Sequence, residues 1–454
     1  MRAQNKENAI LTGSIPKQVM LFFLPICLGT FFQQMYNTAD TLIVGNFVGT
    51  QALAAVGGTG SFVSLLVGFF TGLCSGASII ISQSYGANDH ERIDKQVHVA
   101  LAMAVLSGAL LTVVGLIISR PLLTLMGTPS DVIGMSATYL RVYFLGMIPQ
   151  MLYNMGTGVL RAVGDSKRPL YFLIIASFVN IALDLLFIAV FRWGVAGAAL
   201  ATILSQTVSA VLTLLCLKRY AGMPWDLQLA KVRLEGPVVR EITAIGLPSA
   251  LQGTMYSLSN IIIQSGINSF GTTVMAAWSV YGKIDSLYWM CMGAMGTATM
   301  TFAGQNFGAG LYARVRRGNW VCLSIAATLA LAVTSIFYPS AHFLFSLFSD
   351  DASVIAQGIQ IIHFLTPFYI LYVCVEVFAG TLRGCGDVKT PTIITMLGVC
   401  VIRVFWLLVI VPRFHSVTMV EVSYPITWTI SSVMFVLYYF KSHWLERRIM
   451  ARVR

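Results

Sequence analysis

Charged residues are scarce in this 454-residue chain: Asp, Glu, Lys and Arg make up 10% of it, whereas 57% of it is hydrophobic. A soluble domain typically carries roughly 25% charged residues, so this scarcity excludes an ordinary soluble protein. Long apolar stretches recur along the whole length, each long enough for the ~20 residues that cross a bilayer. The composition therefore predicts a polytopic membrane protein.

Signatures of several enzyme classes are missing as well. None of the eight cysteines belongs to a CxxC pair, so we expect buried or reduced thiols. A GxxxxGK[ST] phosphate loop is absent, which excludes an ATPase within the chain. The GxGD run at Gly384–Asp387 resembles an intramembrane aspartyl protease signature, but an internal repeat explains it better. No nucleophile or metal cluster stands out, so we expect that the protein is not an enzyme.

The apolar stretches predict an all-α fold of twelve transmembrane helices, six in each half of the chain. The first span is part of the internal repeat, so we interpret it as a true span and not as a removable signal peptide. The expected spans are centred near Phe31, Leu66, Val105, Ile148, Phe178, Leu204, Ser257, Trp289, Ala327, Tyr372, Val401 and Phe435.

Three blocks of sequence recur at one offset of 222 residues, which indicates an internal duplication. Their first members are Gly49-Thr50 with Ala54-Ala55, then Gln83 with Gly86-Ala87, then Gly158, Leu160, Arg161, Gly164, Asp165, Lys167 and Pro169. Their copies are Gly271-Thr272 with Ala276-Ala277, then Gln305 with Gly308-Ala309, then Gly380, Leu382, Arg383, Gly386, Asp387, Lys389 and Pro391. A duplicated membrane unit is typical of secondary transporters, whose substrate site lies between the repeats.

The repeat predicts two lobes in the same membrane orientation, because each contains an even number of spans. We expect an N-terminal six-helix lobe over residues 1–217 and a C-terminal six-helix lobe over residues 241–440. Residues 218–240 are interpreted as a cytoplasmic linker, and residues 441–454 as a basic tail on the inner membrane surface.

The net charge of +11 is concentrated on one expected side of the membrane. Of the 29 Lys and Arg residues, 23 fall in the segments 1–17, 92–95, 161–168, 218–240, 314–317, 383–389 and 441–454. The opposite loops hold only Arg120, Arg192 and Arg413. The positive-inside rule therefore predicts that both termini are cytoplasmic. The same distribution accounts for the basic pI without a nucleic-acid partner.

Ionisable groups inside a bilayer are costly, so they are functional candidates by default. Asp40 ends a polar run in the first span, and Tyr36 lies one turn before it on the same face. Asn180 and Asp184 are four residues apart in the fifth span and point the same way. Pro25 removes a backbone donor and is the predicted hinge of the first span. The six candidates are Asp40, Asp184, Lys283, Asp285, Glu376 and Arg403.

The acidic cluster occurs in the first lobe alone. The second-lobe counterparts of Asp40, Asn180 and Asp184 are Ile262, Ile402 and Trp406. Two carboxylates in a low dielectric cannot both ionise cheaply, which suits a group that loads and unloads a proton. The same pair could hold Na⁺ together with Asn180 and the Thr202 hydroxyl. We prefer H⁺ and leave Na⁺ open; no cofactor is expected.

The second lobe carries weaker candidates. Glu376 is a plausible ion-pair partner of Lys283, whereas Arg403 is isolated and is interpreted as structural. Some of the Met and aromatic side chains of this lobe could line an adaptable apolar cavity for cargo. The candidate cargo-pathway residues are Met255, Tyr256, Lys283, Trp289, Met292 and Glu376.

At these residues the sequence resembles the multidrug and toxic compound extrusion (MATE) family, in its prokaryotic type with a coupling site in the first lobe. The resemblance covers nearly the whole chain. It rests on the 6+6 duplication, the Asp40–Gly45 stretch after a span that contains a proline, and the repeated Gln-x-x-Gly-Ala and Leu-Arg-x-x-Gly-Asp blocks. The GxxxD[RK]xG[RK][RK] motif of the major facilitator class is absent.

The resemblance implies a V-shaped pair of six-helix bundles with a central cavity. It implies export of amphipathic, often cationic organic compounds in exchange for H⁺ or Na⁺. It assigns ion coupling to Asp40, Asn180 and Asp184, with Thr202 and Tyr139 completing the site. A second-lobe branch of the family uses a seventh-span Glu, whose position holds Tyr256 here. It also implies a monomer in the bacterial cytoplasmic membrane.

The alternative function is a flippase for a lipid-linked saccharide, because related superfamily members share the lobe architecture. A flippase should carry several cationic residues in its cavity to hold pyrophosphate. Only Lys283 and Arg403 are available for that role, so drug export is the preferred hypothesis.

Overall fold

The computed structural model of the protein describes residues 8–125, 127–219 and 225–453. Every regular element in these ranges is helical, which confirms the all-α prediction. Contacts divide the described chain into two compact units, one of residues 24–250 and one of residues 8–23 and 251–453. The expected N-terminal residues 1–7, the centre of the linker at 220–224 and Arg454 lie outside the described residues.

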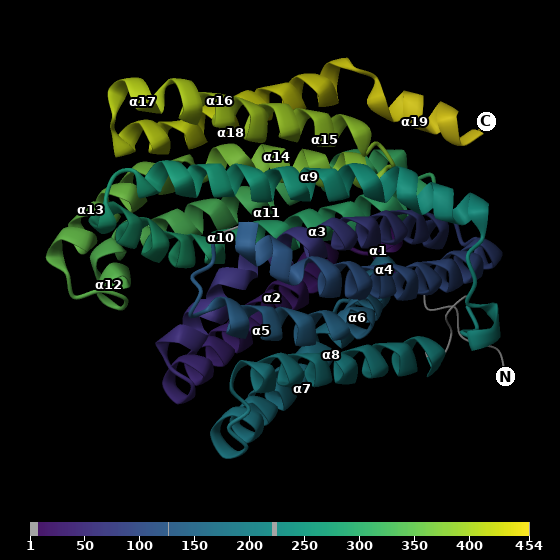
Figure 1. Ribbon diagram of the computed structural model, residues 1–454. Helices are drawn as coiled ribbons and strands as arrows, with labels where there is room; N and C mark the ends of the chain where they lie inside the picture. The colour runs from purple at the N-terminus through teal and green to yellow at the C-terminus, as the bar shows by residue number, and fades with distance from the viewer. Residues whose placement is uncertain (1–7, 126, 220–224, 454) are drawn as a thin grey trace. The chain divides into compact units, whose positions relative to one another are not determined.

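The first lobe is built from seven α-helices and one π-helical turn. Helices α7 and α8 form an antiparallel pair that Figure 1 shows side by side. A short N-terminal helix, α1 (Ala9–Thr12), precedes the first lobe in the chain but belongs to the second unit. The elements are α2 (Ile15–Phe47), α3 (Thr50–Gly86), α4 (His90–Leu125), α5 (Ile133–Leu145), α6 (Met147–Ala162), α7 (Lys167–Asp184), η1 (Leu185–Val190) and α8 (Gly194–Arg219).

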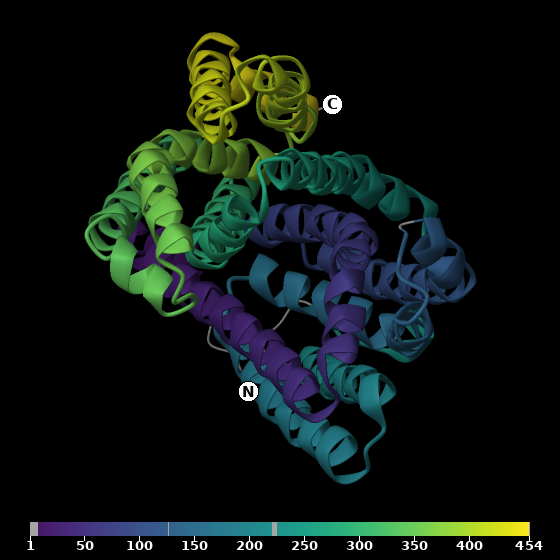
Figure 2. The ribbon, with the colours of Figure 1, turned by 60° about the vertical axis from the view of Figure 1, so that its left-hand side comes forward.

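The second lobe follows the same order after a short linker helix, η2 (Leu229–Lys231). Its last helices, drawn in yellow in Figure 2, pack against one another through α18. The elements are α9 (Gly236–Asn268), α10 (Thr272–Gly308), α11 (Tyr312–Phe337), α12 (Ala341–Ser346), α13 (Ala352–Leu365), η3 (Thr366–Phe368), α14 (Tyr369–Gly384), α15 (Lys389–Thr395), η4 (Met396–Val401), α16 (Ile402–Val409), α17 (Val411–Phe414), α18 (Val417–Lys441) and α19 (Trp444–Val453).

The duplication is visible in the helix boundaries. Helices α3 and α10 each contain 37 residues, and each follows a glycine with a left-handed backbone. The φ angles of Gly49 and Gly271 are 110° and 94°, in a region that only glycine enters without strain. The repeated glycines therefore make the tight turns that connect the first two long helices of each lobe.

Nine helical segments of the described chain are long and apolar enough to cross a membrane. The fourth expected span is divided at Gly146 into α5 and α6, of 13 and 16 residues. The seventh and eighth correspond to α9 and α10, which are long enough but carry more polar residues. Each of the twelve expected centres falls within a helix, so the twelve-span, two-lobe architecture is confirmed.

Small residues allow the helices of each lobe to approach closely, as is usual between membrane helices. A Cβ atom on Gly115 would lie 2.1 Å from Cγ of Phe144, and one on Gly296 would lie 1.9 Å from Oε1 of Glu376. A larger residue at either position would therefore clash with the side chain that fills the space beside the glycine.

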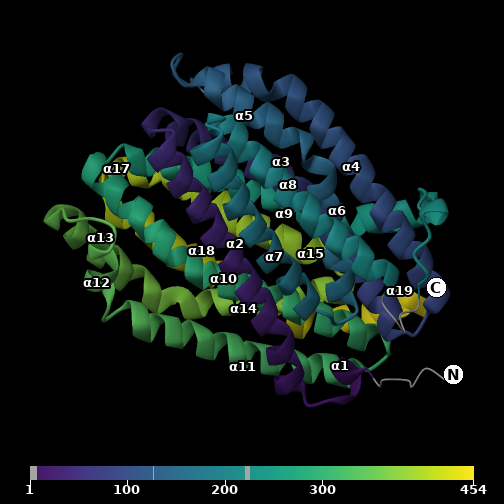
Figure 3. The ribbon, with the colours of Figure 1, turned by 90° about the horizontal axis from the view of Figure 1, so that it is seen from below.

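The first long helix of each lobe is divided between the two compact units. In α2 the division falls between Phe23 and Leu24, next to Pro25, and in α9 it falls after Ala250, two residues beyond Pro248. A proline inside a helix removes one backbone hydrogen bond and favours a kink. At the start of the chain, α1, which is labelled in Figure 3, contacts α10 within the second unit. Asn8, just before α1, donates to Oε1 of Gln305 on α10 at 3.0 Å. The hinge role of Pro25 stays a prediction.

Candidate ion-coupling site

The two first-lobe carboxyl groups face each other inside the lobe. Asp40 lies on α2, and Asp184 is the last residue of α7, fully buried. Their side chains lie within hydrogen-bonding reach of one another. A carboxylate only accepts hydrogen bonds, so a bond between these two groups requires that one of them carries a proton.

Backbone irregularity marks the same place. The π-helical turn η1 begins at Leu185, directly after Asp184. Such turns are frequent at functional sites, because they change the direction of a side chain within an otherwise regular helix. In the second lobe the corresponding helix has its π-helical turn at Met396–Val401, which precedes the position equivalent to Asp184. The two lobes therefore differ in backbone at this point as well as in side chains.

Several polar atoms of the site have no hydrogen-bond partner among the described residues. They are Oδ1 of Asp40, both carboxylate oxygens of Asp184, and Oδ1 and Nδ2 of Asn180. Asn180 is 1% exposed and lies one turn before Asp184. Buried polar groups are normally paired, so an unpaired cluster of this kind indicates a place for a proton, an ion or water.

A small cavity of about 110 Å³ opens beside Asp40. By the size of a water molecule it has room for a few waters or one hydrated ion. Thr202 contributes a hydroxyl whose proton is donated to the Ala198 carbonyl at 3.0 Å, which leaves its lone pairs free to accept. The polar residues that line the cavity are Tyr36, Asn37, Asp40, Thr59, Tyr139, Tyr143 and Thr202.

Tyrosines form one wall of this cavity. The rings of Tyr139 and Tyr143 stack with centroids 6.0 Å apart, and the Tyr143 hydroxyl donates to Oε1 of Gln150 at 3.2 Å. Tyr139 lies close to both carboxyl groups, and Tyr36 lies beside Asp40 and Gln206. A neutral phenol cannot neutralise the acids, and no hydroxyl of this wall donates to Oδ1 of Asp40 or to either oxygen of Asp184.

The structure brings most of the predicted residues together. Asp40, Tyr36, Tyr139 and Thr202 line the cavity, whereas Asn180 and Asp184 are buried and are not among its lining residues. Pro25 lies fifteen positions before Asp40 on the same helix, about 22 Å along its axis, so it is not part of the site itself.

The predicted site residues leave out the cavity residues Asn37, Thr59 and Tyr143, and also Gln150 and Gln206, which lie next to the tyrosines. Asn37 belongs to the polar run of the first span, whereas no sequence signal singled out Thr59. Tyr143 and Gln206 had a usable signal, because Tyr143 follows Tyr139 by four residues and Gln206 follows Thr202 by four. Residues four apart on a helix share a face. Gln150 is seven residues from Tyr143, beyond the break at Gly146, so no simple helical spacing points to it.

An acidic and aromatic network occupies the second lobe. Asp285 accepts hydrogen bonds from the Tyr369 hydroxyl at 2.5 Å and from Nε1 of Trp289 at 2.6 Å. The Tyr372 hydroxyl lies 3.1 Å from that of Tyr256. Each oxygen of Asp285 therefore has a donor, in contrast to the carboxylates of the first lobe.

The expected ion pair between Lys283 and Glu376 is wrong. Lys283 is exposed, and its Nζ lies 5.4 Å from the centre of the Phe348 ring. Glu376 instead accepts from the Tyr372 hydroxyl at 3.4 Å. Lys283 on α10 and Glu376 on α14 are 93 residues apart in the sequence, and their side chains contact different neighbours, which the sequence alone could not reveal.

Other second-lobe predictions have mixed outcomes. Tyr256, Trp289 and Glu376 join the network, and Met292 is 1% exposed beside it, whereas Met255 is half-buried on α9. Arg403 is buried, donates to Thr427 at 2.7 Å and lies 4.0 Å above the Tyr424 ring, as a structural role requires. Glu421 on α18, 4% exposed, was not singled out from the sequence.

The second-lobe counterparts of the coupling residues form no polar site. Ile262 and Ile402 are apolar, and Nε1 of Trp406 donates to the Met419 carbonyl at 2.8 Å. Among the described residues of both lobes, no cluster of three or more His, Cys, Asp or Glu could hold a metal ion. The mixed oxygen set of Asp40, Asn180, Asp184 and Thr202 stays the predicted candidate for Na⁺.

Comparison with known proteins agrees with the duplication. A family profile described as MatE matches residues 25–186 and again residues 248–408, once in each lobe. The "Probable multidrug resistance protein YoeA" of Bacillus subtilis (strain 168) is 29% identical over 447 residues, which cover 96% of each chain. The "FAD transporter" of Shewanella oneidensis is 26% identical and covers 77% of each chain.

Solved structures share the fold over the whole length. A transporter of the MOP superfamily from Pyrococcus furiosus superposes with a TM-score of 0.90 at 25% identity, covering 100% of both chains. An outward-facing multidrug resistance transporter of the MATE family gives a TM-score of 0.88 at 25% identity over 99% of both chains.

Proposed function

Because this chain belongs to the MatE family of membrane transporters, we propose that it exports amphipathic organic compounds, many of them cationic, in exchange for protons. It is a multi-pass membrane transporter and not an enzyme. The names of its multidrug resistance relatives support the cargo class. The bacterial relatives support a place in the cytoplasmic membrane, and the charge distribution supports cytoplasmic termini.

The observation that carries the proton proposal is the facing pair of Asp40 and Asp184. Their unpaired oxygens lie near each other, and no lysine or arginine bonds to them among the described residues. Two ionised carboxylates in this position would repel each other strongly, since their charges are poorly screened. One proton removes the repulsion and supplies the missing donor. Na⁺ would need the same oxygens together with Asn180 and Thr202, and it remains the alternative ion.

A transport cycle follows from these properties. A proton that enters from outside loads the pair, supplies the hydrogen-bond donor that its oxygens lack and shifts α2, whose backbone is weakened at Pro25. The shift reshapes the first-lobe cavity and releases cargo outward, and proton release to the cytoplasm resets the site. Moving one charge across ~100 mV contributes ~2.3 kcal/mol, which supports a ~50-fold gradient of a neutral compound.

The residues available for pyrophosphate argue against a lipid-linked saccharide flippase. Lys283 is exposed beside Phe348, and Arg403 is bound to Thr427 and stacked on Tyr424. Their neighbours are separate aromatic rings, Phe348 for Lys283 and Tyr424 for Arg403, so these two cations do not form the paired cationic set that a pyrophosphate group needs. Drug export therefore remains the preferred function.

Dye efflux from proteoliposomes tests the proposal directly. Vesicles are given a pH gradient alone, a Na⁺ gradient alone, or neither, and the cargo panel includes an organic cation, a neutral compound and a flavin nucleotide. Efflux driven by the pH gradient alone is expected, whereas efflux driven only by Na⁺ would move the assignment to Na⁺. Efflux of the flavin nucleotide alone would overturn the proposed cargo class.

Cargo binding at different acidities tests the antagonism between proton and cargo. For a cargo of constant charge, affinity measured from about pH 8 to about pH 5 should fall as the acid pair loads, and Asp40→Asn should flatten this dependence. A wild-type affinity that does not change with pH contradicts proton–cargo antagonism.

A further inference from the structure

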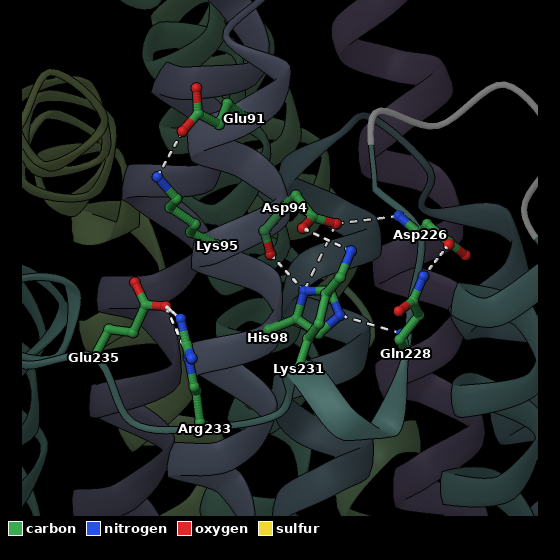
Figure 4. Close-up of polar contacts among 9 residues, drawn as sticks. All are labelled: Glu91, Asp94, Lys95, His98, Asp226, Gln228, Lys231, Arg233 and Glu235. Carbon is green, nitrogen blue, oxygen red and sulfur yellow. Dashed lines mark hydrogen bonds and ion pairs between the residues drawn. The ribbon is translucent and has the colours of Figure 1, made fainter.

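The linker that joins the two lobes is bound to the first lobe at the start of α4. Nε1 of Trp225 donates to the Leu217 carbonyl at 3.0 Å, and the side chains of Trp225 and Leu227 are buried in the first-lobe core. Beyond Trp225, two backbone N–H groups of the linker donate to α4 side chains. The amide of Asp226 donates to Oδ1 of Asp94 at 3.1 Å, and that of Gln228 to Nε2 of His98 at 3.2 Å (Figure 4).

The two partners of His98 define its protonation state. Nδ1 lies 2.7 Å from the backbone carbonyl of Asp94, which can only accept, so Nδ1 carries a hydrogen. Nε2 accepts the Gln228 amide, so it carries none. The ring is therefore neutral, and the residue is 2% exposed. A second proton can be added only at Nε2, the atom that holds the linker.

Asp94 is the charged group nearest to His98. Its Oδ1 lies 3.7 Å from Nδ1 of the ring, and its Oδ2 lies 4.0 Å from Nζ of Lys231. The Asp226 carboxylate accepts from the Gln228 side chain at 2.6 Å. An imidazolium would attract Oδ1 of Asp94, the same atom that accepts the Asp226 amide. Protonation of His98 therefore weakens both hydrogen bonds that hold the linker, the one from the Asp226 amide and the one from the Gln228 amide.

Other charged groups around this end of α4 are paired elsewhere or do not bond to His98. Glu91 with Lys95, Arg233 with Glu235, and Arg92 with Glu241 of α9 form their own pairs at 2.6, 3.0 and 2.6 Å. Among the helices packed on α4, α3 contains no charged residue, and α5 and α6 contain only Arg141 and Arg161, neither of which bonds to His98.

We propose that His98 is a proton-operated latch for the interlobe linker. The neutral ring holds residues 226–228 on α4 by accepting the Gln228 amide. When the cytoplasm acidifies, a proton on Nε2 removes that acceptor and draws Asp94 away from the Asp226 amide, and the linker detaches. Histidine suits this role because its ordinary titration lies between pH 5 and pH 8.

The second lobe offers a natural comparison. The positions equivalent to Asp94 and His98 hold Arg316 and Trp320, neither of which titrates in this range. Arg316 binds Glu446 of α19 at 2.8 Å. The backbone amide of Glu446 and the Arg316 guanidinium lower the pKa of the Glu446 carboxyl, so this contact stays charged in mild acid. Proton control is therefore expected at the linker and not at the equivalent contact.

Hydrogen exchange on the full-length protein in nanodiscs tests the latch. After correction for intrinsic rates, protection of the Asp226 and Gln228 amides should fall by at least about tenfold as the pH is lowered from about 8 to about 5, the range in which histidine side chains ordinarily take up a proton. His98→Gln is the matched control, because its amide oxygen can accept the Gln228 N–H and cannot become charged. Its protection should not change with pH. Equal pH dependence in both proteins, or none in wild type, would overturn the proposal.

Two further measurements test the latch without relying on the His98→Gln variant. Asp94→Asn keeps an oxygen for the Asp226 amide but removes the charge that favours the imidazolium, so the loss of protection should move to lower pH. A nitrogen-15 spectrum of histidine-labelled protein at pH 7.5 should show one buried ring with hydrogen on Nδ1. A ring with hydrogen on Nε2 at His98 would contradict the proposed latch.

Discussion

The two lobes share a backbone and differ in chemistry. Helices α6 and α14 both contain 16 residues, and each is followed by a left-handed glycine, Gly164 with φ 92° and Gly386 with φ 84°. In the first lobe, however, the buried acids lack donors, whereas the second-lobe Asp285 has two. The two lobes therefore share helix lengths and turns, whereas the titratable site depends on a few side chains that one lobe has and the other lacks.

Asp40→Asn should have the largest effect. The amide cannot release or take up a proton, so we expect the steady-state cargo gradient to fall from the ~50-fold that one charge supports to about 1. Efflux under a pH gradient measures it, and membrane insertion and thermal unfolding of the purified protein serve as folding checks. Ile262→Asn, at the equivalent second-lobe position, is the matched control and should keep coupling. Wild-type efflux by Asp40→Asn would show that the site lies elsewhere.

Asp184→Asn and Asn180→Ala should each impair transport by a smaller or similar amount. If Asp40 and Asp184 act as one site, the double mutant is expected to be little worse than the worse single mutant. Initial efflux rates of the two singles and the double measure this coupling. Losses that multiply would mean that the two acids work independently.

Tyr369→Phe should lower stability and alter the cargo range through the second lobe, without changing ion coupling. It removes one donor from the Asp285 carboxylate and leaves a buried acceptor unpaired, which costs about 1–3 kcal/mol. The expected result is a lower unfolding temperature and an altered cargo range, with the dependence on the pH gradient retained. Tyr338→Phe is the matched control, since Tyr338 is exposed and its ring stacks on His363. Loss of proton coupling in Tyr369→Phe would contradict the assignment of ion coupling to the first lobe alone.

Trp406→Phe should have the smallest effect of the series. It loses the hydrogen bond to the Met419 carbonyl, which contributes about 0.5–1.5 kcal/mol to stability. Because Trp406 stands where the first lobe has Asp184, proton-driven efflux should stay at the wild-type rate. A loss of ion binding in a folded Trp406→Phe protein would place part of the coupling site in the second lobe.

The sequence by itself determined the membrane class, the duplication and the residues of the acidic site. These rest on local or repeated signals: apolar stretches, a constant offset, and the four-residue spacing of Asn180 and Asp184 that puts them on one helix face. The absence of acids at Ile262 and Trp406 was equally readable, since the repeat supplies its own internal control.

Only the tertiary structure decided which side chains from separate helices meet. Lys283 and Glu376 looked complementary but point to different neighbours, whereas Asp285 found its donors on α14 and on its own helix. The binding of Gln228 by His98 joins positions 130 residues apart. Such contacts depend on helix rotation and on packing around small residues such as Gly296, which are cooperative properties of the folded lobe. No spacing within a single helix encodes them.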